Sequence, residues 1–208
     1  MLLYLVRHGE TDWNYSRRIQ GSTDIPLNET GRAQARVTGR LLATRHWDSI
    51  VASPLSRALE TATIIAGEVG LGAPTTLPAV VERNYGEAEG LTDAELRSLF
   101  PGDAPVPGRE TREEVVARAL PALLELAKSR PGQSVIVVCH GGVIRSILEA
   151  VDPHNSHPAI TNGSVHSFEY VDGGFRLVAF DDPIEVQSLA YGAADLDEQN
   201  PAEARENA

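Results

Sequence analysis

The sequence predicts an α/β protein, built as a three-layer αβα sandwich around a mostly parallel sheet. Short apolar, β-branched runs alternate along the chain with amphipathic segments of helical period, which is typical of strands that are covered on both faces by helices. The chain has 208 residues, of which 42% are hydrophobic and 5% aromatic. A chain of this size suits one domain with a full core, and we expect it over residues 1–180.

Five apolar runs of strand length give the expected sheet. They are residues 2–6, 49–52, 135–139, 165–171 and 175–180. Helical patterns lie between most of them, so the first three runs are predicted to be parallel strands joined by crossover helices.

Five segments carry helix signals. They are residues 31–45, 55–69, 92–100, 111–128 and 142–151. Thr30 is the expected N-cap of the first, and the Thr92/Glu95 and Thr111/Glu114 pairs are capping boxes. Pro121 lies inside the fourth segment and predicts a kink or break there, whereas the Pro- and Gly-rich stretch 101–108 predicts a surface loop.

The net charge of -11 is uneven along the chain. Residues 181–208 hold eight acidic side chains against Arg205 alone. We expect this segment to be a flexible, solvated tail, with a lid over the site as the less favoured alternative. An acidic protein repels phosphate polyanions at long range, so nucleic acid and anionic membranes are not expected partners.

The N-terminal apolar run is too short for a signal peptide, and no stretch approaches the roughly 18 apolar residues of a membrane span. The sequence therefore predicts a soluble cytoplasmic protein. Cys139 is the only cysteine, which excludes an intrachain disulfide and a cysteine zinc cluster. His154 and His157 lie among prolines without an evident third ligand, so no metal and no cofactor is expected. The oligomeric state stays open, with a homodimer as one option.

Unusual residues follow three of the predicted strands. Arg7 and His8 follow the first strand, residues 53–57 with Arg57 follow the second, and His140 and Gly141 follow the third. Ligands of α/β sheets bind beyond the carboxyl ends of strands. Each residue alone would be interpreted as a surface charge or a structural histidine, but three such strand ends together predict an anion-binding pocket.

Four segments resemble the motifs of the histidine phosphatase superfamily, which has the phosphoglycerate-mutase-like fold. They are LVRHGET at 5–11 with Trp13-Asn14, SPLSRA at 53–58 with Glu60-Thr61-Ala62, ERNYG at 82–86 with Glu89-Gly90, and VVCHGG at 137–142. The motifs occur in the family's order, and strands at 165–180 fit its last pair. Glu60 stands where Gln is frequent in the family.

The resemblance implies phosphoryl transfer through a phosphohistidine. A neutral His8 would attack phosphorus, while Arg7, Arg57 and a protonated His140 would stabilise the phosphate oxygens. Glu82 would protonate the leaving group and then activate water. This chemistry requires no metal and predicts a phosphatase that acts on small phosphorylated metabolites.

The resemblance also implies residues that bind the substrate. Asn14, Gln20 and Gly21 fall where the family lines its phosphate pocket, and Arg83 and Tyr85 are expected to contact the substrate beyond the phosphate. Specificity is expected to lie in residues 83–112.

Three other functions remain as alternatives. A phosphoglycerate mutase is disfavoured because Glu82 and His140 are 58 positions apart, without the long insertion and paired arginines of the mutase branch, and because His140-Gly141-Gly142 departs from the mutase-like His-Gly-Asn. A cysteine phosphatase would use Cys139 with Arg145, but it leaves the other motifs unexplained. A non-catalytic phosphoester-binding module predicts the loss of His8 or Glu82, yet both are present.

Overall fold

A computed structural model describes residues 1–182. Its centre is one six-stranded sheet with the strand order β3-β2-β4-β1-β5-β6. The strands are β1 (Leu2–Arg7), β2 (Ser49–Ala52), β3 (Thr75–Thr76), β4 (Ser134–Cys139), β5 (Val165–Val171) and β6 (Gly174–Ala179). All five predicted strands are present within one residue at each end, and only β3, which has two exposed residues, was not predicted.

The sheet is mixed. β1, β2, β3 and β4 run parallel, whereas β5 pairs antiparallel with both β1 and β6. β1 lies between β4 and β5, so it is hydrogen-bonded on both sides along its length. Because β1, β2 and β4 point the same way, their carboxyl ends meet at one edge of the sheet, where the predicted pocket should lie.

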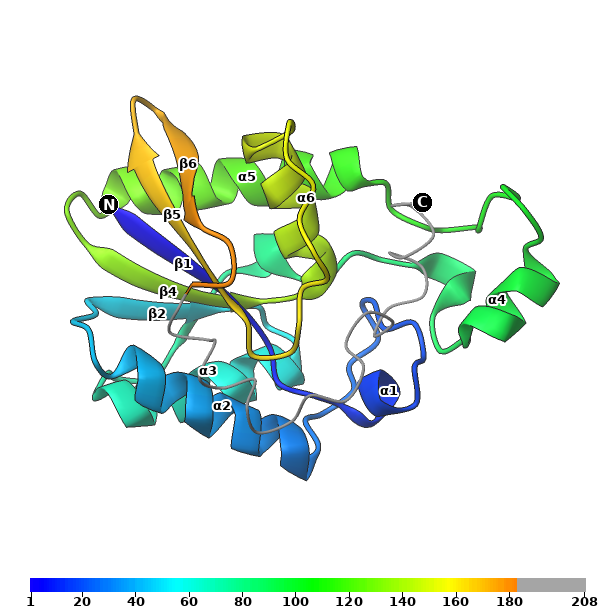
Figure 1. Cartoon of the computed structure of the whole chain (residues 1–208), viewed down its shortest axis with the longest axis horizontal. Coiled ribbons are helices and arrows are strands. Elements are labelled where there is room, and N and C mark those ends of the chain that lie inside the picture. The colour runs from blue at the N-terminus through cyan, green and yellow to red at the C-terminus, as the bar shows by residue number, and fades with distance from the viewer. Residues whose placement is uncertain (183–208) are drawn as a thin grey trace.

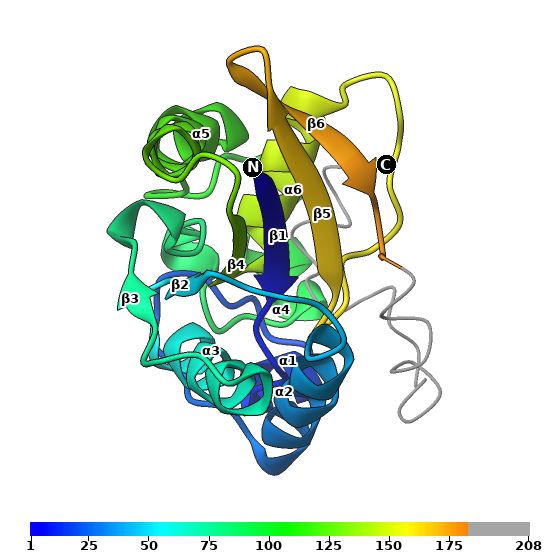
Figure 2. The ribbon, with the colours of Figure 1, turned by 90° about the vertical axis from the view of Figure 1, so that its left-hand side faces the viewer.

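Helices cover both faces of the sheet, which confirms the three-layer architecture (Figures 1 and 2). The helices are α1 (Asp12–Tyr15), α2 (Glu29–Leu42), α3 (Ser56–Val69), α4 (Asp93–Leu99), α5 (Arg112–Ser129) and α6 (Gly141–Val151), with 3₁₀ turns at Pro78–Val80 and Gly86–Ala88. In Figure 2, α2 and α3 lie on one side of the sheet and α5 and α6 on the other.

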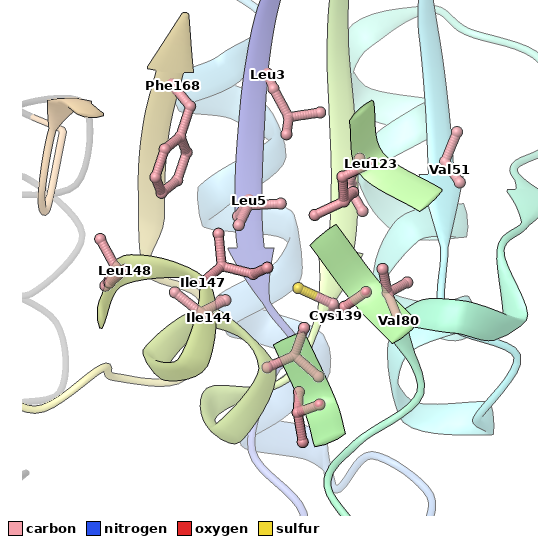
Figure 3. Close-up of a cluster of buried hydrophobic side chains, with 14 of the residues drawn as sticks. Leu3, Leu5, Val51, Val80, Leu123, Cys139, Ile144, Ile147, Leu148 and Phe168 are labelled. Atoms are coloured by element: carbon pink, nitrogen blue, oxygen red, sulfur yellow. The ribbon is translucent and has the colours of Figure 1, made fainter. Parts of the chain in front are cut away.

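Alternate side chains of β1 fill the two halves of the core, as the period of a strand requires. Leu3 and Leu5 pack with α5 and α6, whereas Tyr4 and Val6 pack with α2 and α3. Figure 3 shows the first cluster, in which the Cys139 side chain lies among apolar side chains from β1 and α6. The strand that leads directly into His8 is therefore packed on both faces.

Local sequence patterns predicted some helix termini correctly and others not. Both predicted capping boxes are present. The prediction for Thr30 is wrong, because α2 begins two residues earlier with Asn28 as its N-cap, and Asn28 also donates to Glu10 Oε1 at 2.8 Å. Of the kink or break predicted at Pro121, the break is wrong, since α5 continues through it, and the kink stays a prediction. Pro121 is exposed, so the carbonyl that lacks an N–H partner there lies on the solvent side of the helix.

Two further predictions concern the ends of the chain and the membrane. Most of the predicted tail, residues 183–208, lies outside the described residues. Asp182 is described and is buried, with its backbone N–H donating to Val165 O at 2.9 Å. No helix within residues 1–182 is long and apolar enough to cross a bilayer.

Candidate active site

The three strand ends bring Arg7, His8, Arg57 and His140 together, as the sequence predicted. All four side chains are at most 6% exposed. The rings of His8 and His140 lie 5.1 Å apart between centroids at an angle of 61°. Two imidazoles and two guanidinium groups thus share one buried space, which is an unusual concentration of nitrogen donors.

His8 is held in one tautomer. Its Nδ1 lies 2.7 Å from Gly9 O, and because a carbonyl can only accept, Nδ1 carries the proton. Burial lowers the pKa of His8 well below its usual value, and the charges of Arg57 and Arg7 lower it further. The neutral ring therefore keeps a lone pair on Nε2, which is the form that a nucleophile needs.

Arg57 is fixed by the loop that precedes α2. Its Nη2 donates to Gly21 O at 2.7 Å and its Nη1 to Thr23 O at 3.0 Å. The donors around Gln20 orient its amide, whose oxygen accepts from Arg57 Nε at 2.8 Å and Nη1 at 3.1 Å. One N–H of Nη2 is left without an acceptor among the described residues, so Arg57 can donate this N–H to a phosphate oxygen while it keeps its bonds to the loop.

Arg7 is anchored by the segment 160–164, which precedes β5. Its Nη1 donates to Ile160 O, and its backbone pairs with Ser164 O and Gly163 N at 3.0 Å each. A Cβ on Gly141 would lie 3.4 Å from Arg7 Nε. The start of α6 therefore lies in van der Waals contact with the guanidinium.

The surroundings of His140 oppose a charged ring while no anion is bound, and the protonated His140 predicted for phosphoryl transfer stays a prediction. Burial, and then the charges of Arg57 and Arg7, lower its pKa well below the usual value. Its Nε2 lies 2.7 Å from Ser53 Oγ, whereas its Nδ1 has no hydrogen-bond partner among the described residues. Without a bound anion, burial and the arginine charges oppose protonation and favour the neutral ring.

Glu82 sits at the amino end of α6. Its carboxylate accepts from the backbone N–H groups of Gly142 and Val143 at 3.2 Å each, and from its neighbour Arg83 at 2.8 Å. A Cβ on Gly142 would lie 2.8 Å from Glu82 Oε1. The negative charge of Glu82 also acts on Arg57, so the proposed acid belongs to the same charge cluster as the phosphate-binding residues.

The other predicted binding residues support the pocket in different ways. Asn14 is buried and accepts from Thr11 N and Thr11 Oγ1 at 3.1 Å each. Gln20 and Gly21 hold Arg57, as described above. Arg83 donates to Glu110 O at 2.7 Å and lies over the Tyr85 ring.

Tyr85 is fully buried. A Cβ on Gly142 would lie 3.0 Å from Tyr85 Oη, which places the hydroxyl beside the start of α6. A cleft of about 580 Å³ adjoins this region and is lined by Glu82, Asn84 and Arg109 among others. The segment 83–112, in which the sequence predicts substrate specificity, therefore contributes to a cleft beside Glu82.

Three supporting residues were not predicted. Asn162 donates to His8 O at 2.9 Å, Thr61 Oγ1 accepts from Gly9 N at 3.1 Å and donates to Arg57 O at 2.7 Å, and Ser53 contacts His140. Ser53 and Thr61 lie inside a segment that had been singled out, and their hydroxyl groups were the available signal. Asn162 lies 154 positions after His8, and no local pattern could connect them.

The cysteine alternative finds no support in the structure. Cys139 is fully buried, and burial raises the pKa of its thiol far above the usual range. Arg145 instead donates to the carbonyls of His157 and Pro158. Within residues 1–182 no group of three His, Cys, Asp or Glu side chains is placed to hold a metal ion.

Comparison with known proteins gives a consistent result. Residues 3–183 match the family model described as histidine phosphatase superfamily (branch 1). The chain is 39% identical over 176 residues to the uncharacterized phosphatase PhoE of Bacillus subtilis, covering 83% of this chain and 90% of that protein. It is 32% identical over 201 residues to a metal-independent phosphoserine phosphatase of Arabidopsis thaliana, covering 91% and 84%.

Mutases and solved structures are matched as well. A 2,3-bisphosphoglycerate-dependent phosphoglycerate mutase of Cytophaga hutchinsonii is 28% identical over 206 residues, covering 91% of this chain and 92% of that protein. The structure of a mycobacterial glucosyl-3-phosphoglycerate phosphatase with VO3 superimposes with a TM-score of 0.80 at 30% identity, covering 86% of this chain and 98% of that one.

Proposed function

Since the chain belongs to the histidine phosphatase superfamily, branch 1, we propose that it is a metal-independent phosphomonoesterase that hydrolyses small phosphorylated metabolites through a phosphohistidine on His8. The observation that carries this proposal is the state of His8: a neutral ring with Nδ1 bonded to Gly9 O and its Nε2 lone pair kept free beside two buried arginines.

The first half of the reaction forms the phosphoenzyme. His8 Nε2 attacks phosphorus, the bond from phosphorus to the ester oxygen breaks, and the phosphoryl group moves to the ring. Arg7 and Arg57 stabilise the negative charge on the phosphoryl oxygens. A protonated Glu82 supplies the proton that the leaving oxygen needs.

The second half restores the enzyme. Glu82, now a carboxylate, takes a proton from water, whose oxygen attacks phosphorus as the bond to His8 breaks. Its position on the N–H groups of Gly142 and Val143 supports this role, because those donors stabilise the carboxylate that follows the first proton transfer.

A panel of phosphate monoesters, assayed with a chelator present, tests the proposal. We expect turnover by the wild type and by Cys139→Ser, and none by His8→Ala, because only His8 can store the phosphoryl group. Full activity of His8→Ala would refute the proposal. Loss of activity in Cys139→Ser with retention in His8→Ala would establish the cysteine chemistry instead.

A mutase is the second candidate, favoured by the similarity to phosphoglycerate mutases. The two differ in the acceptor, since a mutase returns the phosphoryl group to a bound phosphoglycerate and excludes water. Isomerisation of phosphoglycerate that outpaces release of inorganic phosphate would decide for the mutase. Both enzymes should give a phosphoenzyme that is labile in acid and stable in base, and an acid-stable adduct would contradict phosphohistidine.

A further inference from the structure

The loop formed by residues 20–24 wraps around the Arg57 guanidinium. Gln20 supplies its amide oxygen, and Gly21 and Thr23 supply backbone carbonyls. At the end of the loop, Asp24 accepts from Ser56 N at 2.9 Å and Ser56 Oγ at 2.7 Å. The orientation of Arg57 therefore depends on the conformation of this loop rather than on α3 alone.

One side chain, Glu89, accepts hydrogen bonds from the middle of this loop. Its Oε1 accepts from Ser22 N at 2.9 Å, Ser22 Oγ at 3.2 Å and Tyr85 N at 3.1 Å, and its Oε2 accepts from Thr23 N at 2.9 Å and from Thr23 Oγ1. All five partners donate, and only an ionised carboxylate can accept from all of them at once. A Cβ on Gly21 would lie 2.2 Å from Glu89 Oε1, so the loop and the carboxylate are in close contact.

The backbone on either side of this contact is paired as well. Ile19 N donates to Leu91 O at 2.9 Å, and Gly90 N donates to Ile19 O at 2.8 Å. These bonds hold the start of the loop against the segment that carries Glu89. They do not reach the Ser22 and Thr23 N–H groups, which depend on the Glu89 carboxylate.

The charges agree with this geometry. Partial burial raises the pKa of Glu89, but hydrogen bonds from Thr23, Ser22 and Tyr85 outweigh burial and lower it, so the side chain is a carboxylate at neutral pH. Burial lowers the pKa of Arg57 to about 10, and the negative charges of Glu82, Asp24 and Glu89 act against that loss.

We propose that Glu89 is a positioning residue, whose carboxylate orders residues 22–23 so that the carbonyls of Gly21 and Thr23 fix Arg57 for binding the phosphoryl group. This inference rests on the proposed function, in which Arg57 stabilises the transferring phosphoryl group. It assigns to Glu89 an indirect role, through Arg57, and no contact with substrate.

The test compares Glu89→Gln with Glu95→Gln. Glu95 is a matched control because its carboxylate also accepts from a backbone N–H and a hydroxyl group, both of Thr92. Its further contact is with Arg18 at 3.4 Å, so it is not bonded directly to the loop 20–24 or to Arg57. The glutamine at position 89 would turn an NH₂ group toward N–H donors of the loop. A displaced Arg57 should lower kcat by about 100-fold, the order expected from a misplacement of about 1 Å.

Affinity for orthovanadate, which mimics the five-coordinate transition state, separates positioning from a merely structural role. It is measured by calorimetric titration, in which the stoichiometry counts the folded protein. In Glu89→Gln we expect vanadate affinity to fall in proportion to kcat while KM changes less, and Glu95→Gln to match the wild type in all three. Wild-type kcat and vanadate affinity in Glu89→Gln would overturn the inference.

A milder variant covers the case in which Glu89→Gln does not fold. Thr23→Val removes one hydroxyl donor to Glu89 and keeps the backbone carbonyl that holds Arg57, so it should shift kcat and vanadate affinity in the same direction by less. Unchanged values in Thr23→Val would then overturn the inference. Failure of the proposed function is distinguishable, because it would appear as a wild-type enzyme without phosphatase activity or as an active His8→Ala.

Discussion

His166 should make the stability of this protein sensitive to acid. The ring lies on β5, is fully buried and packs 4.6 Å from the Phe180 ring between centroids. Its Nδ1 accepts from Asp181 N at 3.3 Å, so the proton of the neutral ring is on Nε2, which lies 2.9 Å from Ser164 Oγ. This arrangement has no place for a second proton on Nδ1.

Burial, and then the charges of Arg145 and His157, lower the pKa of His166 to about 3. The Asp181 carboxylate, 3.8 Å from Nδ1, would favour the charged ring, but burial and the N–H that points at Nδ1 oppose it more strongly. In the unfolded chain the pKa of a histidine is about 6.5.

The direction of the change in stability with pH follows from the pKa values of His166 in the folded and unfolded states. Well above pH 6.5 the ring is neutral in both states and contributes nothing to the pH dependence. As the pH falls from about 6.5 toward 3, only the unfolded chain takes up the proton, so the folded state loses stability. Between pH 7 and pH 5 the loss from this one group is about 2 kcal/mol.

Urea denaturation of the wild type and of His166→Asn, each at pH 7 and pH 5, measures this loss. Asparagine keeps an acceptor near the position of Nδ1 but does not titrate. The wild type should lose about 2 kcal/mol more than the variant between the two pH values, and groups common to both proteins, His8 and His140 included, cancel in the difference. An equal loss in the two proteins would refute the reasoning.

Three further predictions follow from contacts around the site. Thr61→Val should lower the free energy of unfolding by about 1–3 kcal/mol, because a buried backbone N–H loses its acceptor, and the check is urea denaturation with Thr61→Ser, which keeps the hydroxyl, as control. Gly31→Ala should lower the free energy of unfolding by about 1–3 kcal/mol, since its Cβ would lie 2.1 Å from Glu10 O. Gly67→Ala is the control and should not destabilise, because a Cβ there meets nothing within 4 Å. Equal melting temperatures of the two variants would contradict the predicted clash at Gly31. Because the pKa of His8 is lowered, kcat/KM corrected for substrate ionisation should persist well below pH 6.5, and an acid limb centred at 6.5 would show that His8 titrates normally.

The elements of the fold were largely predictable because their signals are local. Capping boxes at Thr92 and Thr111 mark helix starts by residues three positions apart. Asn28 replaced Thr30 as the cap of α2 partly because of a contact with Glu10, which no helical pattern contains. Pro121 was tolerated because it falls on the exposed side of α5, and exposure depends on the packing of the whole layer.

The residues of the site were likewise predictable where their signals are local in the sequence. Arg7, His8 and His140 were predictable because each directly follows a buried strand, and Arg57 and Glu82 because of the motifs around them. Gln20 and Gly21, which orient Arg57, were predicted through the family resemblance, whereas Asn162 was not, because it lies 154 positions after His8. The charge on His140 was also beyond a sequence argument, because it depends on how closely the arginines and His8 surround a buried ring.

The neutral resting state of His140 couples anion binding to proton uptake. A phosphate dianion beside the ring would oppose the arginine charges that lower the pKa of His140, so the complex would bind more protons than the empty enzyme at the same pH. The affinity for phosphate, expressed per dianion, would then strengthen as the solution becomes more acidic. The heat of phosphate binding would also vary with the ionisation enthalpy of the buffer, because the buffer supplies the proton.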